Sequence, residues 1–207
     1  FYEAIKISLK ILEIHNSNNH VNYRSKENLV SLQSYYFQIG DFDNAERFNK
    51  ELLRRKTEID SLIYLGTLDD ILFFKKEYEK ALNIVEQHSS IADKQIWWGE
   101  EGIRSFKKGG LRISLVSKKH LGINIPSSII NDYRLYIEEN KTQIGKLTFD
   151  HMTFWYTVYL ILGDVEYIDY AYNSLMEKVN KMDLVYGKKY MGYPIQKKIL
   201  MEYKKYN

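Results

Sequence analysis

The stretch LVSLQSYYFQIGDFDNAERFNKELL, from Leu29 to Leu53, decides the fold of this chain. It contains two apolar runs at helical spacing, separated by Gly40 as a turn residue and Asp41 as a candidate N-cap. Two helices joined by so short a turn pack antiparallel. Ala45, on the second helix, is small enough to let the two backbones approach closely. One such hairpin cannot bury its apolar faces alone, so the fold depends on whether the pattern recurs.

The pattern recurs along the chain. An aromatic residue stands three positions before an alanine at three places, which are Phe1/Ala4, Phe42/Ala45 and Tyr78/Ala81. The alanines are separated by 41 and 36 residues, and a further step of 33 residues reaches Ser114. These intervals scatter around a period of about 34 residues, which is typical of helix–turn–helix repeats. The sequence therefore predicts an array of helical hairpins.

The register resembles that of the tetratricopeptide-repeat family. The matching positions of the first complete unit are Leu29, Leu32, Tyr36, Gly40, Phe42 and Ala45, and those of the next are Leu65, Leu68, Leu72, Tyr78 and Ala81. Later matches are Trp98, Gly102 and Gly109, and then Trp155, Tyr159, Gly163, Val165 and Ile168. The sequence departs from the family pattern where small residues are preferred, at Gln33, Asp69, Lys76, Ser105 and Ser114. Asp69 occupies a tightly packed position, where a buried carboxylate needs a partner.

The resemblance implies an all-α fold, a superhelix of tetratricopeptide type in one domain spanning residues 1–207. Its expected units are 1–16, 24–56, 58–89 and 91–120, an inserted helix at 127–140, a degenerate unit at 148–181 and a capping helix at 193–206. Within the third unit, Gly109 is expected to separate helices at 91–107 and 110–119. The residues between 181 and 193 are assigned to no unit. Because the chain starts at Phe1, inside a repeat, we expect it to be a fragment of a longer protein.

The resemblance also implies a concave groove lined by the first helix of each hairpin. Its exposed positions would include Glu27, Val30 and Ser34. The candidate partner-binding residues of this groove are Phe37, Gln38, Asp70, Phe73, Phe74, Glu100, Ile103, Phe106 and Lys107. In one interpretation the phenylalanines anchor a peptide or a helix. In the other they pack between hairpins and belong to the core. The residues with which the family clamps a C-terminal carboxylate are absent.

A basic stretch follows the groove residues in the sequence. Its candidate patch consists of Arg104, Lys108, Arg112, Lys118 and Lys119. Such a patch attracts an acidic partner or a nucleic-acid backbone. A solvated helix face is the simpler interpretation, and the net charge of +3 gives no independent argument for nucleic acid. Nucleic acid is therefore the less favoured partner.

No pattern of catalysis or cofactor binding occurs in the sequence. There is no cysteine, the five histidines form no pair at helical spacing, and no phosphate-binding glycine motif is found. We therefore expect no catalytic residue, no metal site and no cofactor, and we expect that the chain is not an enzyme. No apolar run approaches the roughly 20 residues that a membrane span needs, and a cytoplasmic location is expected.

The function expected from these features is that of an interaction module of a larger protein. It would bind a protein or a peptide, or another domain of the same chain, through the concave groove. One alternative is a peptide-sensing regulatory domain of a signalling or transcription-control protein. A second alternative is nucleic-acid contact through residues 104–120.

Overall fold

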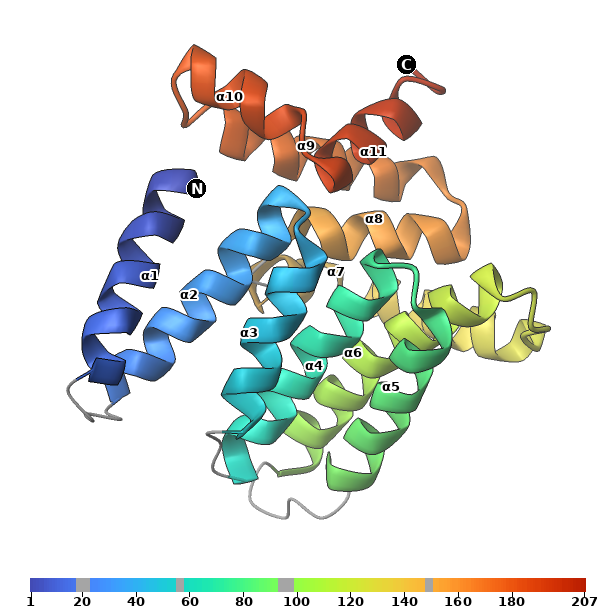
Figure 1. Cartoon of the computed structure of the whole chain (residues 1–207). Helices are drawn as coiled ribbons and strands as arrows, with labels where there is room; N and C mark the ends of the chain where they lie inside the picture. The colour runs from blue at the N-terminus through green and yellow to red at the C-terminus, as the bar shows by residue number, and fades with distance from the viewer. Residues whose placement is uncertain (18–22, 55–57, 93–98, 148–150) are drawn as a thin grey trace. The chain divides into compact units, whose positions relative to one another are not determined.

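The structure is entirely helical over the residues that it describes (Figure 1). It is a computed structural model that describes residues 1–17, 23–54, 58–92, 99–147 and 151–207. These residues form eleven helices and contain no strand. The all-α prediction is therefore confirmed. None of the described helices is both long and apolar enough to cross a membrane.

The chain divides into two compact units at residue 117, whereas the sequence analysis treated it as one repeat domain. In unit 1, each of the first four helices packs against the next one along the chain. The helices that begin in this unit are α1 (Tyr2–Ser17), α2 (Tyr23–Ile39), α3 (Phe42–Arg54), α4 (Glu58–Phe74), α5 (Tyr78–Ala92) and α6 (Gly99–His120). The unit boundary falls within the last turn of α6.

Unit 2 is built around α9, which contacts α8 along its length and also packs against α10 and α11. Its helices are α7 (Ser127–Leu147), α8 (His151–Leu162), α9 (Val165–Val179), α10 (Leu184–Met191) and α11 (Pro194–Tyr203). The final helix has Pro194 at its start, where the missing N–H costs nothing. This helix lies within the range 193–206, where a capping helix was expected.

The turn between α2 and α3 explains why the quoted stretch forms a hairpin. Gly40 has a φ of 81°, in the left-handed region that favours glycine. Its amide donates to the Phe37 carbonyl at 3.0 Å, and the Asp41 amide donates to the Tyr36 carbonyl at 2.9 Å. These bonds close the end of α2 as a Schellman motif. The Asp41 carboxylate then accepts from the Asn44 amide at 3.2 Å and begins α3.

The same turn geometry recurs after α4, and a left-handed glycine also follows α8. Lys76 has a φ of 69°, and the amides of Lys76 and Glu77 donate to the carbonyls of Phe73 and Leu72, both at 2.9 Å. Gly163, which separates α8 from α9, has a φ of 81°. Lys76 therefore adopts the backbone conformation of Gly40, although the sequence places a side chain there. In the hairpins α2–α3, α4–α5 and α8–α9 a left-handed residue follows the first helix, but at Gly163 the amide donates instead to the Tyr159 carbonyl at 2.8 Å.

Exchanging the residue types at the two equivalent turns gives opposite expected effects. A non-glycine residue in the left-handed region costs roughly 1–2 kcal/mol, and glycine in the unfolded chain costs about 0.5–1 kcal/mol. Gly40→Ala should therefore lower the free energy of unfolding by about 1 kcal/mol, and Lys76→Gly should raise it by up to about 1 kcal/mol. Urea unfolding followed by helix circular dichroism measures both. A loss of stability in Lys76→Gly would contradict the equivalence of the turns.

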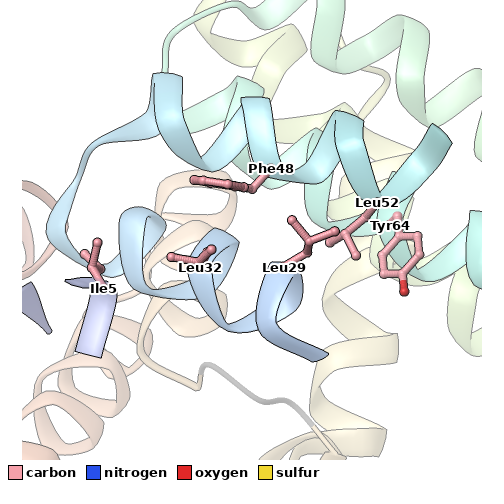
Figure 2. Packing of buried hydrophobic residues seen from close by; sticks show 6 residues of the cluster. All are labelled: Ile5, Leu29, Leu32, Phe48, Leu52 and Tyr64. Atoms are coloured by element: carbon pink, nitrogen blue, oxygen red, sulfur yellow. The ribbon is translucent and has the colours of Figure 1, made fainter. Parts of the chain in front are cut away.

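The core of unit 1 lies between α1, α2, α3 and the beginning of the next hairpin. Figure 2 shows the side chains at its centre, which are Ile5, Leu29, Leu32, Phe48, Leu52 and Tyr64. Ala45 is fully buried, as the close approach of α2 and α3 requires. Asn49 is also fully buried, and its Nδ2 donates to the Tyr64 carbonyl at 3.0 Å. This bond joins the α2–α3 hairpin to α4.

Two helix predictions differ from the structure. Gly109 and Gly110 do not end a helix, because α6 continues through both. Each helical glycine costs about 1 kcal/mol, but burial of Ile113, Leu115 and Val116 offsets this loss. The second difference is α10, which lies between the expected unit at 148–181 and the expected capping helix. It begins with Asp183, whose side chain accepts hydrogen bonds from the amides of Val185 and Tyr186.

Candidate interaction surface

The phenylalanines expected to line a groove are buried within unit 1. The rings of Phe37 and Phe74 meet edge to face with centroids 5.6 Å apart, and Phe73 meets Phe74 at 5.1 Å. Phe42 stacks on Phe74 at 6.2 Å. All three candidate anchors are therefore parts of one aromatic cluster at the hairpin turns. This corrects the exposure expected of Phe37, Phe73 and Phe74, because pairing of the rings covers the apolar surface that a ligand would need.

Asp70 is half-buried and forms an ion pair with Arg112. Arg112 Nη2 lies 2.7 Å from Asp70 Oδ1 and 2.8 Å from Oδ2, so that one residue of the expected groove pairs with one of the expected basic patch. Arg112 is itself buried, which corrects its expected place on an exposed surface. The neighbouring Asp69 is also buried, as its position in the repeat pattern indicated. Burial raises the pKa of Asp69, and the adjacent Asp70 raises it further, while Arg112 opposes both.

Some of the remaining residues of the predicted groove and basic patch have side chains that the structure describes, and the others do not. Gln38 and Lys118 are half-buried. Lys119 is exposed, but its Nζ donates to the carbonyls of Leu160 at 2.9 Å and Ile161 at 3.1 Å, at the C-terminal end of α8. The side chains of six predicted residues lie outside the described part of the chain, and these are Glu100, Ile103, Arg104, Phe106, Lys107 and Lys108.

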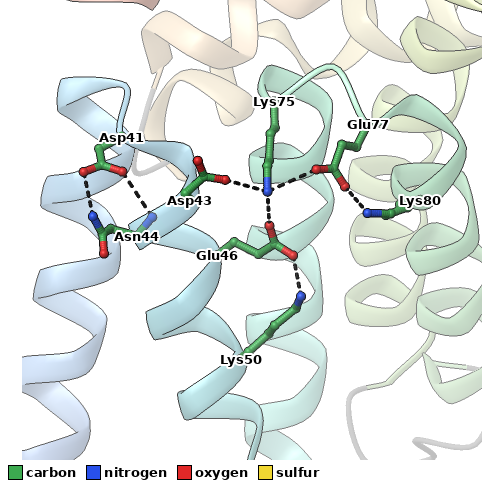
Figure 3. Close-up of polar contacts among 8 residues, drawn as sticks. All are labelled: Asp41, Asp43, Asn44, Glu46, Lys50, Lys75, Glu77 and Lys80. Carbon is green, nitrogen blue, oxygen red and sulfur yellow. Dashed lines mark hydrogen bonds and ion pairs between the residues drawn. The ribbon is translucent and has the colours of Figure 1, made fainter.

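Lys75 forms the centre of a polar cluster between two hairpins, which we name the lysine clamp (Figure 3). Its Nζ lies 2.7 Å from Asp43 and 2.6 Å from Glu46, both on α3, and 3.0 Å from Glu77 in the α4–α5 turn. Glu46 is also bound by Lys50 at 2.5 Å, and Glu77 by Lys80 at 2.5 Å. The clamp joins neighbouring hairpins through charge-assisted bonds, so its charges serve packing.

The pKa values of the clamp residues follow from this geometry. Burial acts to raise the pKa of Glu46, but the hydrogen bonds from Lys50 and Lys75 outweigh it and bring the pKa below its ordinary value of 4.5. Lys80 and then Lys75 lower the pKa of Glu77. The carboxylates of Asp43 and Glu46 raise the pKa of Lys75. Glu46, Glu77 and Lys75 are therefore charged near neutral pH.

Removing the central cation tests the clamp. Lys75→Met should lower the free energy of unfolding at pH 7 by about 1 kcal/mol, because the buried Glu46 loses one of its two lysines. Carboxylates with a lowered pKa stabilise the fold above their unfolded pKa, and this contribution is lost as the pH falls through the folded pKa. The variant should therefore lose less stability than the wild type between pH 5 and pH 3. Urea titrations across this range measure the difference.

Lys80 offers a matched control for Lys75. It is more exposed and pairs with Glu77 alone among the ion pairs described. Lys80→Met should change the free energy of unfolding by less than about 0.5 kcal/mol. Equal losses of stability in the two variants would show that Lys75 stabilises the fold no more than an exposed lysine does.

Unit 2 contains a comparable lysine between α7 and α9. Lys141 Nζ lies 2.7 Å from Glu166 and 3.3 Å from Glu138, and it approaches the ring of Tyr170 at 5.2 Å. The hydroxyl of Tyr170 donates to Glu166 at 2.7 Å, and that of Tyr167 donates to Glu138. The role of these two lysines was not predicted from the sequence. The sequence shows that the acids beside Lys75 stand near helix starts, but only the folded chain brings them together around one lysine.

The described residues expose one face of α2. Glu27, Val30 and Ser34 are exposed, and Val30 is 41% exposed although it is aliphatic. Their spacing of three and four residues places them on one stripe of the helix. The opposite stripe contains the buried residues Leu29, Leu32 and Gln33. Of the groove positions expected on α2, these three are exposed, whereas Gln38 is half-buried and Phe37 is buried.

A metal site was not expected from the sequence. No three side chains of histidine, aspartate or glutamate gather there in a way that could hold a metal ion. Glu46 is paired with Lys75, and Asp70 is paired with Arg112. Comparison with known proteins assigns no family, since no family model, curated protein or solved structure matches the chain.

Proposed function

We propose that the chain is a protein- or peptide-binding module of tetratricopeptide-repeat type, which recognises its partner through the exposed face of first helices. The observation that carries the proposal is the stripe of Glu27, Val30 and Ser34 on α2. This stripe is the part of the expected groove that remains exposed. It presents one exposed aliphatic side chain between two polar ones.

The recurrent turns support this proposal. Gly40, Lys76 and Gly163 all have a positive φ, and each stands between two consecutive helices. A recurring turn of this kind is what an array of repeat units would contain. The lysine clamp and the aromatic cluster fix the α2–α3 hairpin against α4–α5. A rigid stack of this kind positions a binding face without ordering it on binding, which favours affinity.

The test is capture of a partner from lysate of the source cells with the wild-type chain and with Val30→Asp. The substitution introduces a charge at an exposed site, so it should leave the helix content unchanged. Leu135→Asp is the matched control, because Leu135 is an exposed aliphatic residue on α7. We expect the partner to be retained by the control and reduced by about tenfold or more in Val30→Asp. Equal capture by Val30→Asp, or no partner for the wild type, would contradict the proposal.

A further inference from the structure

The beginning of α10 exposes three consecutive apolar side chains. Leu184 is 74% exposed, Val185 is 75% exposed and Tyr186 is 62% exposed. These are the highest values among the exposed large apolar side chains of the described residues. We name this feature the apolar tip. Exposing these side chains to water is unfavourable, so the tip is a candidate for contact with another apolar phase.

The apolar tip is held on a fixed base. Gly187 is buried against α9, where a Cβ atom in its place would lie 3.3 Å from Val179 Cγ1. Tyr190, one turn further, is also buried and meets Tyr193 edge to face at 6.0 Å. One side of α10 therefore packs against the rest of unit 2, while the side chains of its first turn are exposed.

The backbone of the tip satisfies its own polar groups. Asp183 Oδ1 accepts from the amides of Val185 and Tyr186, each at 3.0 Å, and the Asp183 carbonyl accepts from the Gly187 amide at 2.8 Å. An N–H without a partner makes entry into an apolar medium costly. Capping by Asp183 lowers this cost for the part of the helix that carries the tip.

The segment of the chain that carries the tip is rich in lysine. From Glu177 to the end of the chain there are eight lysines and three acidic residues. Each acid has a local partner, because Glu177 binds Lys181 at 2.7 Å, Asp183 caps α10 and Glu202 binds Lys205 at 2.7 Å. The other exposed lysines of this segment are Lys188, Lys189, Lys197, Lys198 and Lys204.

Two of these lysines stand directly behind the tip. Lys188 and Lys189 follow Leu184 and Val185 by four residues, so each lies about one turn, or roughly 5 Å, further along the same side of the helix. This order places aliphatic groups outermost and ammonium groups a short distance behind them. The interface of an anionic bilayer has the complementary order, with acyl chains beneath a layer of phosphate.

We propose that the apolar tip docks unit 2 on the surface of an anionic phospholipid membrane. Consecutive helix residues point about 100° apart, so a flat protein surface cannot cover Leu184, Val185 and Tyr186 together. A fluid interface surrounds them all. Tyrosine is favoured at the headgroup level, and lysine stems extend toward phosphate. The sequence contains no arginine after Arg134, so the bidentate phosphate contacts typical of nucleic-acid readers are unavailable to this surface.

Vesicle flotation tests this proposal with the full chain. The vesicles are phosphatidylcholine alone or phosphatidylcholine with about 30% phosphatidylserine, and we expect at least about tenfold stronger binding to the anionic ones. Leu184→Ser with Val185→Ser, and separately Lys188→Glu with Lys189→Glu, should each reduce binding by about tenfold or more. The matched controls are Leu135→Ser and the pair Lys10→Glu with Lys76→Glu, which alter exposed residues of the same types elsewhere.

Several results would overturn the proposal. They are absence of binding to anionic vesicles, equal binding to both compositions, or binding that either tip variant leaves unchanged. Binding to a single-stranded RNA that needs Lys188 and Lys189 but not Leu184 and Val185 would assign the surface to nucleic acid instead. Failure here would leave the proposed partner site on α2 untouched, because the two tests change different helices.

Discussion

Trp155→Ala should lower the free energy of unfolding of unit 2 by about 3–5 kcal/mol. Trp155 is buried on α8, and its ring is parallel to that of Tyr167 at 6.0 Å and lies 5.1 Å from that of Tyr170. Truncation removes the aromatic partner of both α9 tyrosines and leaves a cavity between the two helices. Urea unfolding followed by helix circular dichroism measures the loss.

Two further measurements make this prediction specific. Trp155→Phe keeps a ring between α8 and α9, so it should cost less, about 1–2 kcal/mol. Hydrogen exchange should show the largest loss of protection in peptides from α8 and α9, because these helices meet at Trp155. A loss below about 1 kcal/mol in Trp155→Ala would contradict the central place of this residue in unit 2.

Phe48→Ala should destabilise unit 1 by a similar amount, about 3–5 kcal/mol. Phe48 lies at the centre of the cluster in Figure 2 and stacks on Tyr36 with centroids 5.5 Å apart. The guanidinium of Arg47 covers its ring at 4.5 Å. The substitution therefore removes a packed ring and a cation–π contact together. Thermal and urea unfolding of the purified chain measure the effect.

Phe48→Leu is the control for ring loss without a large cavity. It should cost about 1–1.5 kcal/mol, since the aliphatic side chain still fills most of the space between α2 and α3. Protection from hydrogen exchange should fall first in peptides from these two helices in the alanine variant. If Phe48→Ala and Phe48→Leu are equally stable, the packing described for this core is wrong.

The hairpin turns could be predicted because they depend on local chemistry. Gly40 and Asp41 stand between two amphipathic runs, and the structure confirms a left-handed residue followed by a helix start. At Gly109 and Gly110 the same reasoning was wrong. Local propensity favours an end there, but burial of the following residues keeps α6 continuous. The first turn of α10 carried a readable signal in Asp183, an N-cap residue before an apolar run.

The candidate site was less predictable because exposure depends on residues far apart in the sequence. A phenylalanine at the end of a first helix faces either a groove or its neighbours, and Phe37 meets Phe74, 37 residues later, in the structure. Arg112 reaches back to Asp70 across 42 residues. Val30 was predictable, because its place on the stripe follows from helical periodicity alone. Sequence therefore indicated the exposed face better than it indicated the anchors.

Hydrogen exchange with and without the captured partner tests the central claim most directly, which is that the exposed face of α2 binds a protein or peptide. The measurement compares deuterium uptake of peptides covering α2, Tyr23–Ile39, with that of peptides from the remaining described helices. The account predicts slower exchange in α2 when the partner is bound, and no such change with Val30→Asp. Slower exchange confined to other helices, with α2 unchanged, would contradict it.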